Sequence, residues 1–168
     1  ETRLARQKLR NQWSRRPEAE QFPPQLEYER RVLASLDGSR EDYAEAIRAL
    51  PLRLRILLVQ SYSSYLFNQT LSELLSTGDY VNDPALGDIV AETDLYGLLR
   101  PKSLKVDRYN IQNIRERARR GRVVVVLPVP GYQVEIPRGP KGEAMARILD
   151  QEKVSLEDFN TPCLPEGK

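Results

Sequence analysis

Residues 56–72 contain no charged side chain, although Lys, Arg, Asp and Glu make up 30% of the chain. Apolar residues recur at a spacing of four from Leu54 through Leu66, and others widen this stripe to more than half of a helix circumference. The pattern predicts a central helix over residues 51–76 in which Leu58 and Leu66 are fully buried. The run also contains Gln, Ser and Asn and is too short to span a bilayer, so it does not indicate a membrane protein.

The remaining sequence predicts an α+β chain, with a helical N-terminal half followed by a small mixed β-sheet packed with helices. Helical periodicity and capping signals, including Ser39 before the third helix, predict further helices over residues 1–16, 25–36, 39–50, 107–120 and 142–153. Short β-type runs predict strands over 88–91, 103–106, 122–127 and 133–136. The unbroken run 123–127 predicts a strand that is buried on both faces.

The composition excludes several classes of enzyme. The chain has no histidine and a single cysteine, so neither a Ser-His-Asp nor a Cys-His pair can form. A zinc site built from the usual Cys and His ligands is also excluded, as is an internal disulfide. Cys163 stands between Pro162 and Leu164 and is interpreted as incidental rather than nucleophilic.

Residues 100–122 form the strongest electrostatic feature, with nine Lys and Arg against two Asp and Glu. A net charge of +7 over this segment predicts a polyanionic partner such as RNA. The side chains expected to contact phosphates are Lys102, Lys105, Arg108, Arg115, Arg119, Arg120 and Arg122. The alternative is that the arginines of 115–120 complement a helix dipole and solvate an exposed face. A second basic run, within residues 3–16, is interpreted as a solvated helix face.

Three other groups of residues have a chemical and a structural interpretation, and the structural one is favoured for each. Residues 139–142 (Gly-Pro-Lys-Gly) precede a helix but lack the spacing of a phosphate loop, which favours a turn. An acid/base pair among Asp88, Asp94 and Asp107 competes with roles at strand ends and helix caps. The aromatic side chains Tyr62, Tyr65 and Phe67 would suit stacking on RNA bases, but their place on the most apolar helix favours core packing.

Several motifs resemble those of the TruD-type tRNA pseudouridine synthases. Residues 50–55 (LPLRLR) and 60–68 (QSYSSYLFN) are similar to that family's LP-x-RLR and AYQSYLFN stretches, with Ser-Tyr-Ser-Ser in place of Ala-Tyr-Gln-Ser. The other similar segments, including a GD strand and a PGY turn, are 71–72, 87–90, 126–132, 154–159 and 164–168. The resemblance covers residues 45–168 in the family's order.

The resemblance implies a parent protein that isomerises uridine to pseudouridine in tRNA with an aspartate and without metal or organic cofactor. The family's catalytic aspartate lies in a Gly-x-Lys-Asp segment, and this chain has no Lys-Asp dipeptide. The family's Asn-x-Phe-Gly-x-Gln-Arg-Phe-Gly segment is absent too. The chain therefore resembles the inserted domain alone, over residues 1–168, with a helical lobe in 1–78 and an α+β lobe in 79–168. No catalytic residue is assigned.

The partners expected from the resemblance are tRNA or another structured RNA and the catalytic domain of the same parent chain. The inserted domain would form one wall of the RNA cleft. The expected location is the cytoplasm, or the nucleus in a eukaryote. The alternative is a free-standing RNA- or protein-interaction module with no catalytic role. The start at Glu1, without methionine, favours the excised domain.

Overall fold

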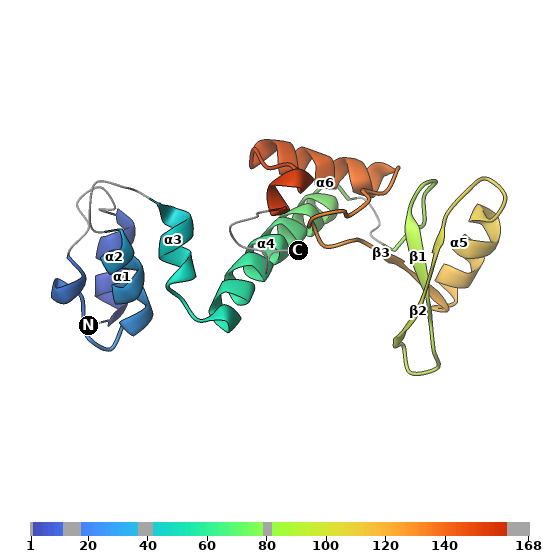
Figure 1. The fold of residues 1–168 in the computed structure, drawn as a ribbon. Coiled ribbons are helices and arrows are strands. Elements are labelled where there is room, and N and C mark those ends of the chain that lie inside the picture. Colours follow the sequence, from blue (N-terminus) through green and yellow to red (C-terminus); the bar gives the residue numbers. More distant parts are fainter. Residues whose placement is uncertain (1, 12–17, 37–41, 79–81, 161–168) are drawn as a thin grey trace. The chain divides into compact units, whose positions relative to one another are not determined.

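The computed structural model describes residues 2–11, 18–36, 42–78 and 82–160, which form two compact units. Unit 1 extends to Val59 and unit 2 covers Gln60–Asn160, so the boundary falls inside the helix Leu52–Ser76. The elements are α1 (Thr2–Asn11), η2 (Ala19–Gln21), α2 (Glu27–Ser35), α3 (Tyr43–Arg48), α4 (Leu52–Ser76), β1 (Ile89–Thr93), β2 (Leu99–Lys105), α5 (Ile111–Arg119), β3 (Val123–Val126), α6 (Pro140–Gln151) and η3 (Leu156–Phe159) (Figure 1). The predicted α+β class, with helices first and a small sheet later, is confirmed.

Unit 1 is held together by a small apolar cluster. Phe22, Leu26 and Leu33 are buried with Ala19, and Leu9 of α1 packs against them. Helix α3 begins after Asp42, whose Oδ1 accepts a hydrogen bond from the Glu45 backbone N–H at 2.9 Å. The predicted cap Ser39 lies outside the described residues, as do Cys163 and the motif segment 164–168. None of the described helices is long and apolar enough to cross a membrane.

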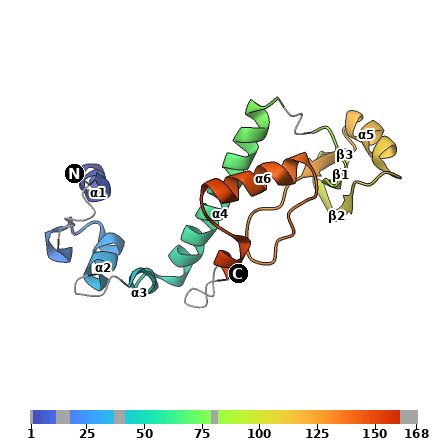
Figure 2. The ribbon, with the colours of Figure 1, turned by 90° about the horizontal axis from the view of Figure 1, so that it is seen from above.

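The sheet has the strand order β2-β1-β3, and both pairings are antiparallel, so the described sheet is not mixed as predicted. Val90 of the central strand lies opposite Leu104 and Val125. Helix α5 packs on the face that carries Val90, through Ile114, and both views of the fold show the helix beside the sheet (Figures 1 and 2). The apolar side of α5 is thereby buried, and its polar side remains at the surface.

Two strand predictions are wrong. Residues 133–136 form no strand, because Gln133 has a φ of 61° and turns the chain out of the extended conformation. Strand β3 pairs only with β1 among the described strands, and of its residues only Val123 is buried. It is an edge strand rather than one covered on both faces.

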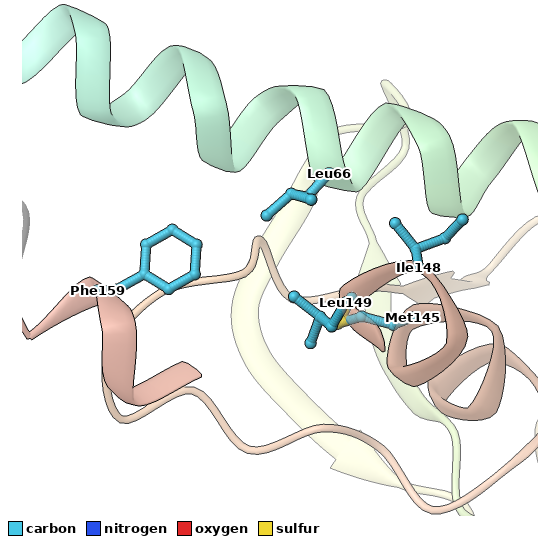
Figure 3. Packing of buried hydrophobic residues seen from close by; sticks show 5 residues of the cluster. All are labelled: Leu66, Met145, Ile148, Leu149 and Phe159. Carbon is cyan, nitrogen blue, oxygen red and sulfur yellow. The ribbon is translucent and has the colours of Figure 1, made fainter. Parts of the chain in front are cut away.

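The long helix α4 has nearly the predicted bounds, but it buries a different face. Leu66 is fully buried as predicted and packs against Met145, Ile148 and Leu149 of α6 and Phe159 of η3 (Figure 3). The prediction for Leu58 is wrong, since 48% of that residue is exposed.

Leu58 instead lines an apolar groove of about 330 Å³ within unit 1, together with Leu54 and Leu57 and with side chains of α1 and α2. In unit 2 the buried positions of α4 are Ser63, Leu66, Thr70 and Leu74. Thr70 is tolerated there because its hydroxyl donates to the Leu66 carbonyl at 3.0 Å.

Candidate nucleic-acid interface

The basic segment 100–122 covers strand β2 from its second residue, the turn before α5, the whole of α5 and the turn that leads to β3. Every residue of β2 is exposed, and α5 buries only Ile114 fully. The segment therefore presents its charges on the outside of a small packed layer. This layer is the part of unit 2 in which a polyanion would meet the highest density of positive charge.

Two arginines of this layer pair with the carboxylate of Glu92, on the central strand β1, and the charge of Lys102 also acts on it. Arg117 of α5 donates to Glu92 Oε1 at 2.6 Å, and Arg100 of β2 lies 4.0 Å from Oε2. The hydrogen bond from Arg117 lowers the pKa of Glu92, and the charges of Arg117, Arg100 and Lys102 lower it further, against a smaller rise from burial. We call these four residues the Glu92 cluster. One carboxylate is held among three cations, so the cluster keeps an excess of positive charge.

The predicted phosphate-contacting residues fall into different environments. Lys102, Arg119 and Arg122 are exposed and form no ion pair shorter than 4 Å with any described residue. Lys105 lies opposite Ile89, on the sheet face away from α5, and its Nζ is 3.6 Å from Glu135.

The other three predicted residues have partners near them. Arg108 stacks on the Tyr109 ring at 5.1 Å. Arg115 donates to the Pro84 carbonyl at 3.0 Å and lies 3.8 Å from Asp83, and Arg120 pairs with Glu116 on its own helix. The structure thus places Lys102 near Arg100 and Arg117. Both arginines lie in the basic segment 100–122, but neither is among the seven side chains expected to contact phosphates. Their meeting at Glu92 depends on how α5 packs on the sheet.

Residues 139–142 form the N-terminal end of α6 rather than the predicted turn, and Lys141 locks this end to the start of β1. Lys141 is buried, and its Nζ donates to Asp88 Oδ2 at 2.7 Å and to the Asp83 carbonyl at 2.9 Å. A side chain at Gly142 would place its Cβ 1.8 Å from the Pro137 carbonyl oxygen, so only glycine fits there. Because its lysine is buried and paired with Asp88, this end of α6 offers no exposed lysine to a phosphate.

The three aspartates considered for acid/base chemistry have separate structural contacts. Asp88 forms the ion pair with Lys141 and accepts from the Ala85 backbone N–H at 2.9 Å. Asp94 accepts from two backbone N–H groups of the β1–β2 turn, and Asp107 accepts from those of Tyr109 and Asn110. Within the described residues, no group of three or more acidic or cysteine side chains could hold a metal ion.

Of the aromatic residues of α4, Tyr62 and Tyr65 are exposed and Phe67 is half-buried. The Tyr62 ring lies 6.1 Å from that of Tyr65 and 6.4 Å from that of Phe159. The Tyr65 hydroxyl donates to Glu152 at 2.8 Å, and this hydrogen bond raises the pKa of Tyr65. These contacts join α4 to α6 and η3 within unit 2, but Tyr62 is 38% exposed and Tyr65 41%, so the core-packing prediction is wrong for these two side chains.

Comparison with known proteins gives one consistent family. The family model described as tRNA pseudouridine synthase D (TruD) matches residues 1–168. A curated relative from Methanopyrus kandleri, named as a probable tRNA pseudouridine synthase D, is 34% identical over 96% of this chain and 33% of its own length. A relative of the same name from Thermococcus sibiricus is 34% identical over 87% of this chain and 34% of its own.

A crystal structure of a TruD protein from Methanosarcina mazei superimposes with a TM-score of 0.83 at 32% identity. It covers 99% of this chain, which corresponds to 38% of the solved one. The chain therefore spans about a third of the length of the proteins that it matches.

Proposed function

Because the chain belongs to the tRNA pseudouridine synthase D (TruD) family, we propose that it is an RNA-gripping domain, inserted in a parent protein that converts uridine to pseudouridine in tRNA. The observation that supports this role is the excess positive charge of the Glu92 cluster, next to the exposed Arg119 and Arg122. Phosphate contacts of this kind supply affinity and position without reading sequence. The RNA-modifying chemistry would reside in the remaining two thirds of the parent protein.

RNA binding by the exposed cations is tested by changing Lys102, Arg119 and Arg122 to Ser in the 168-residue chain. These side chains are exposed, so the variant keeps its fold. If all three contact phosphates, the slope of log affinity against log salt concentration flattens by about 2–3, since each contact contributes roughly 0.7–0.9. Titration of tRNA at several salt concentrations measures both affinity and slope.

A matched control removes the same charge from a different surface. Arg3, Lys8 and Arg10 are exposed on α1 in unit 1, and their triple Ser variant has the same net charge as the test variant. We expect this control to bind tRNA with nearly the parental slope. If both variants lost tRNA affinity equally, the loss would be explained by net charge alone. A phosphate-binding surface on β2 and α5 would then be rejected.

The second test concerns catalysis. The 168-residue chain has no Lys-Asp dipeptide, and each of its candidate aspartates is held in a structural contact. We expect the purified chain to form no pseudouridine in tRNA, with a pseudouridine synthase of established activity as the positive control. Release of tritium from 5-tritiated uridine in tRNA measures the reaction. Turnover by the chain that disappears in the Asp94→Asn or Asp107→Asn variant would contradict the proposed division of labour.

A further inference from the structure

The turn between β1 and β2 carries a group of large apolar side chains that are mostly exposed. Leu95 is 84% exposed, Tyr96 89% and Leu98 67%, and Leu99 at the start of β2 is 58% exposed. Isolated exposed apolar residues are common, but four within five positions on one hairpin form a patch. Such a patch exposes apolar surface to water, which makes it a candidate binding surface.

This turn is rigid, although its side chains are exposed. Asp94 Oδ1 accepts from the backbone N–H groups of Tyr96 and Leu98 at 2.8 and 2.9 Å. The Asp94 N–H donates to the Leu98 carbonyl at 2.9 Å, and Gly97 supplies the φ of 78° that closes the turn. Tyr96 is thus presented on a fixed backbone, so little conformational entropy is lost when its ring meets a ligand.

The base of the hairpin is joined to the basic end of α5. The Thr93 hydroxyl donates to the Gly121 carbonyl at 2.7 Å, and the Thr93 N–H donates to the Arg122 carbonyl at 3.0 Å. Glu92, which precedes Thr93, is the centre of the Glu92 cluster, and Arg100 immediately follows Leu99. The apolar tip therefore projects from a positively charged base.

This combination favours one class of ligand. A protein partner or a lipid surface could cover the leucines. The exposed tyrosine and the cations beside it together favour a ligand that carries planar apolar surfaces and closely spaced negative charge. Unpaired nucleotides in RNA have this chemistry, because bases stack on aromatic rings while the adjoining phosphates bind arginine and lysine. A continuous duplex would bring phosphates but would keep its bases stacked on one another.

We propose that Tyr96 stacks on an unpaired base of the bound RNA, while the Glu92 cluster and Arg122 hold the phosphates beside that base. This inference rests on the proposed function, since it names the part of the RNA that the domain recognises. The hairpin then directs the domain toward loops or bulges, and the basic surface supplies affinity that is independent of sequence.

The test compares two RNA ligands and three variants at Tyr96 in the 168-residue chain. One ligand is a stem-loop that carries the fluorescent base 2-aminopurine in its loop, and the other is a fully paired duplex of equal length. Tyr96→Ala is expected to weaken stem-loop binding roughly 5- to 150-fold, the range for loss of one stacked base. Duplex affinity and the salt slope stay at parental values, because no charge is removed.

Two further substitutions separate stacking from apolar contact. Tyr96→Phe keeps an aromatic face and is expected to retain both stem-loop affinity and quenching of 2-aminopurine. Tyr96→Leu keeps apolar surface without a ring and is expected to lose both, as Tyr96→Ala does. The control is Tyr28→Ala, which removes a half-exposed tyrosine from α2 in unit 1 and leaves binding unchanged. Since Tyr96 is almost fully exposed, thermal melts of its variants should match that of the parent.

Each contrary result identifies what has failed. Parental stem-loop affinity in Tyr96→Ala would overturn the stacking inference, and the proposed function would stand if the Lys102, Arg119 and Arg122 variant still weakened binding. Parental affinity in Tyr96→Leu would show that the hairpin makes an apolar contact, such as a protein would use, rather than a stack. If the unaltered chain bound neither RNA, the proposed function itself would be rejected.

Discussion

Replacing Lys141 with methionine is expected to lower the free energy of unfolding by about 3–5 kcal/mol. Lys141 and Asp88 have side-chain exposures of only 4% and 1%, and the 2.7 Å ion pair between them joins the start of α6 to the start of β1. Methionine fills the space of the lysine but leaves the Asp88 carboxylate buried without a cation, and its Oδ2 keeps only the hydrogen bond from the Ala85 backbone N–H. Its Oδ1 already lacks a hydrogen-bond partner in the described structure, so the loss of Lys141 adds to the cost of burying this charge.

Urea unfolding at neutral pH measures this effect, and two variants sharpen it. Lys153→Met makes the same substitution at an exposed site in unit 2 and should change stability by less than about 0.5 kcal/mol. The double variant Lys141→Met with Asp88→Asn removes the orphaned charge and should recover part of the loss. If Lys141→Met were as stable as the Lys153 control, the ion pair would not be a structural lock, and the phosphate-loop interpretation of residues 139–142 would reopen.

Leu66→Ala is the second substitution with a large expected effect, about 2–5 kcal/mol of lost stability. Leu66 has no exposed surface and contacts the apolar cluster that α6 and η3 form against α4 (Figure 3). Truncation leaves a cavity in a site bounded by two helices, which can close it only in part. Thermal or urea unfolding gives the difference in free energy.

Leu75→Ala is the control for this prediction. It makes the same chemical change on the same helix and in the same unit, but Leu75 is 65% exposed. We expect its stability to remain within about 0.5 kcal/mol of the parental value. Equal losses from the two substitutions would mean that α4 does not bury the face described here.

The sequence pattern of α4 predicted that the helix exists and where it ends, but it did not predict which face of the helix is buried. Ile56–Ser72 is apolar over so much of its circumference that periodicity alone does not say which side meets the core. In the structure, the buried side of α4 includes Ser63 and Thr70, which have small side chains. The Thr70 hydroxyl donates its hydrogen bond to a carbonyl of the same helix. A polar residue at a buried position is therefore compatible with the core when its hydrogen bond is local, and a search for apolar residues alone misses it.

For the candidate interface too, the sequence predicts the segment but not the environment of each side chain. Charge counting located the segment, but whether a given arginine is available to a ligand depends on the carboxylates that tertiary structure brings to it. Arg115 meets Asp83 from a distant loop, and Arg117 meets Glu92 from the central strand. The hairpin tip at Leu95–Leu99 was within reach of sequence reasoning, because Asp94 and Gly97 mark a turn between two β-type runs. Its significance comes only from the exposed fractions, which the sequence does not reveal.

The exposed strand β2 has a consequence for how copies of this chain behave toward one another. Among the described strands it pairs only with β1, so its other edge offers backbone N–H and C=O groups to which a second copy could add a strand. Pro101 removes one of these donors, and Lys102 and Lys105 would set like charges against each other in such a pairing. The lysines of β2 thus oppose self-association of this kind. Substitutions of these lysines, including those made to test RNA binding, would also alter the tendency of the protein to aggregate.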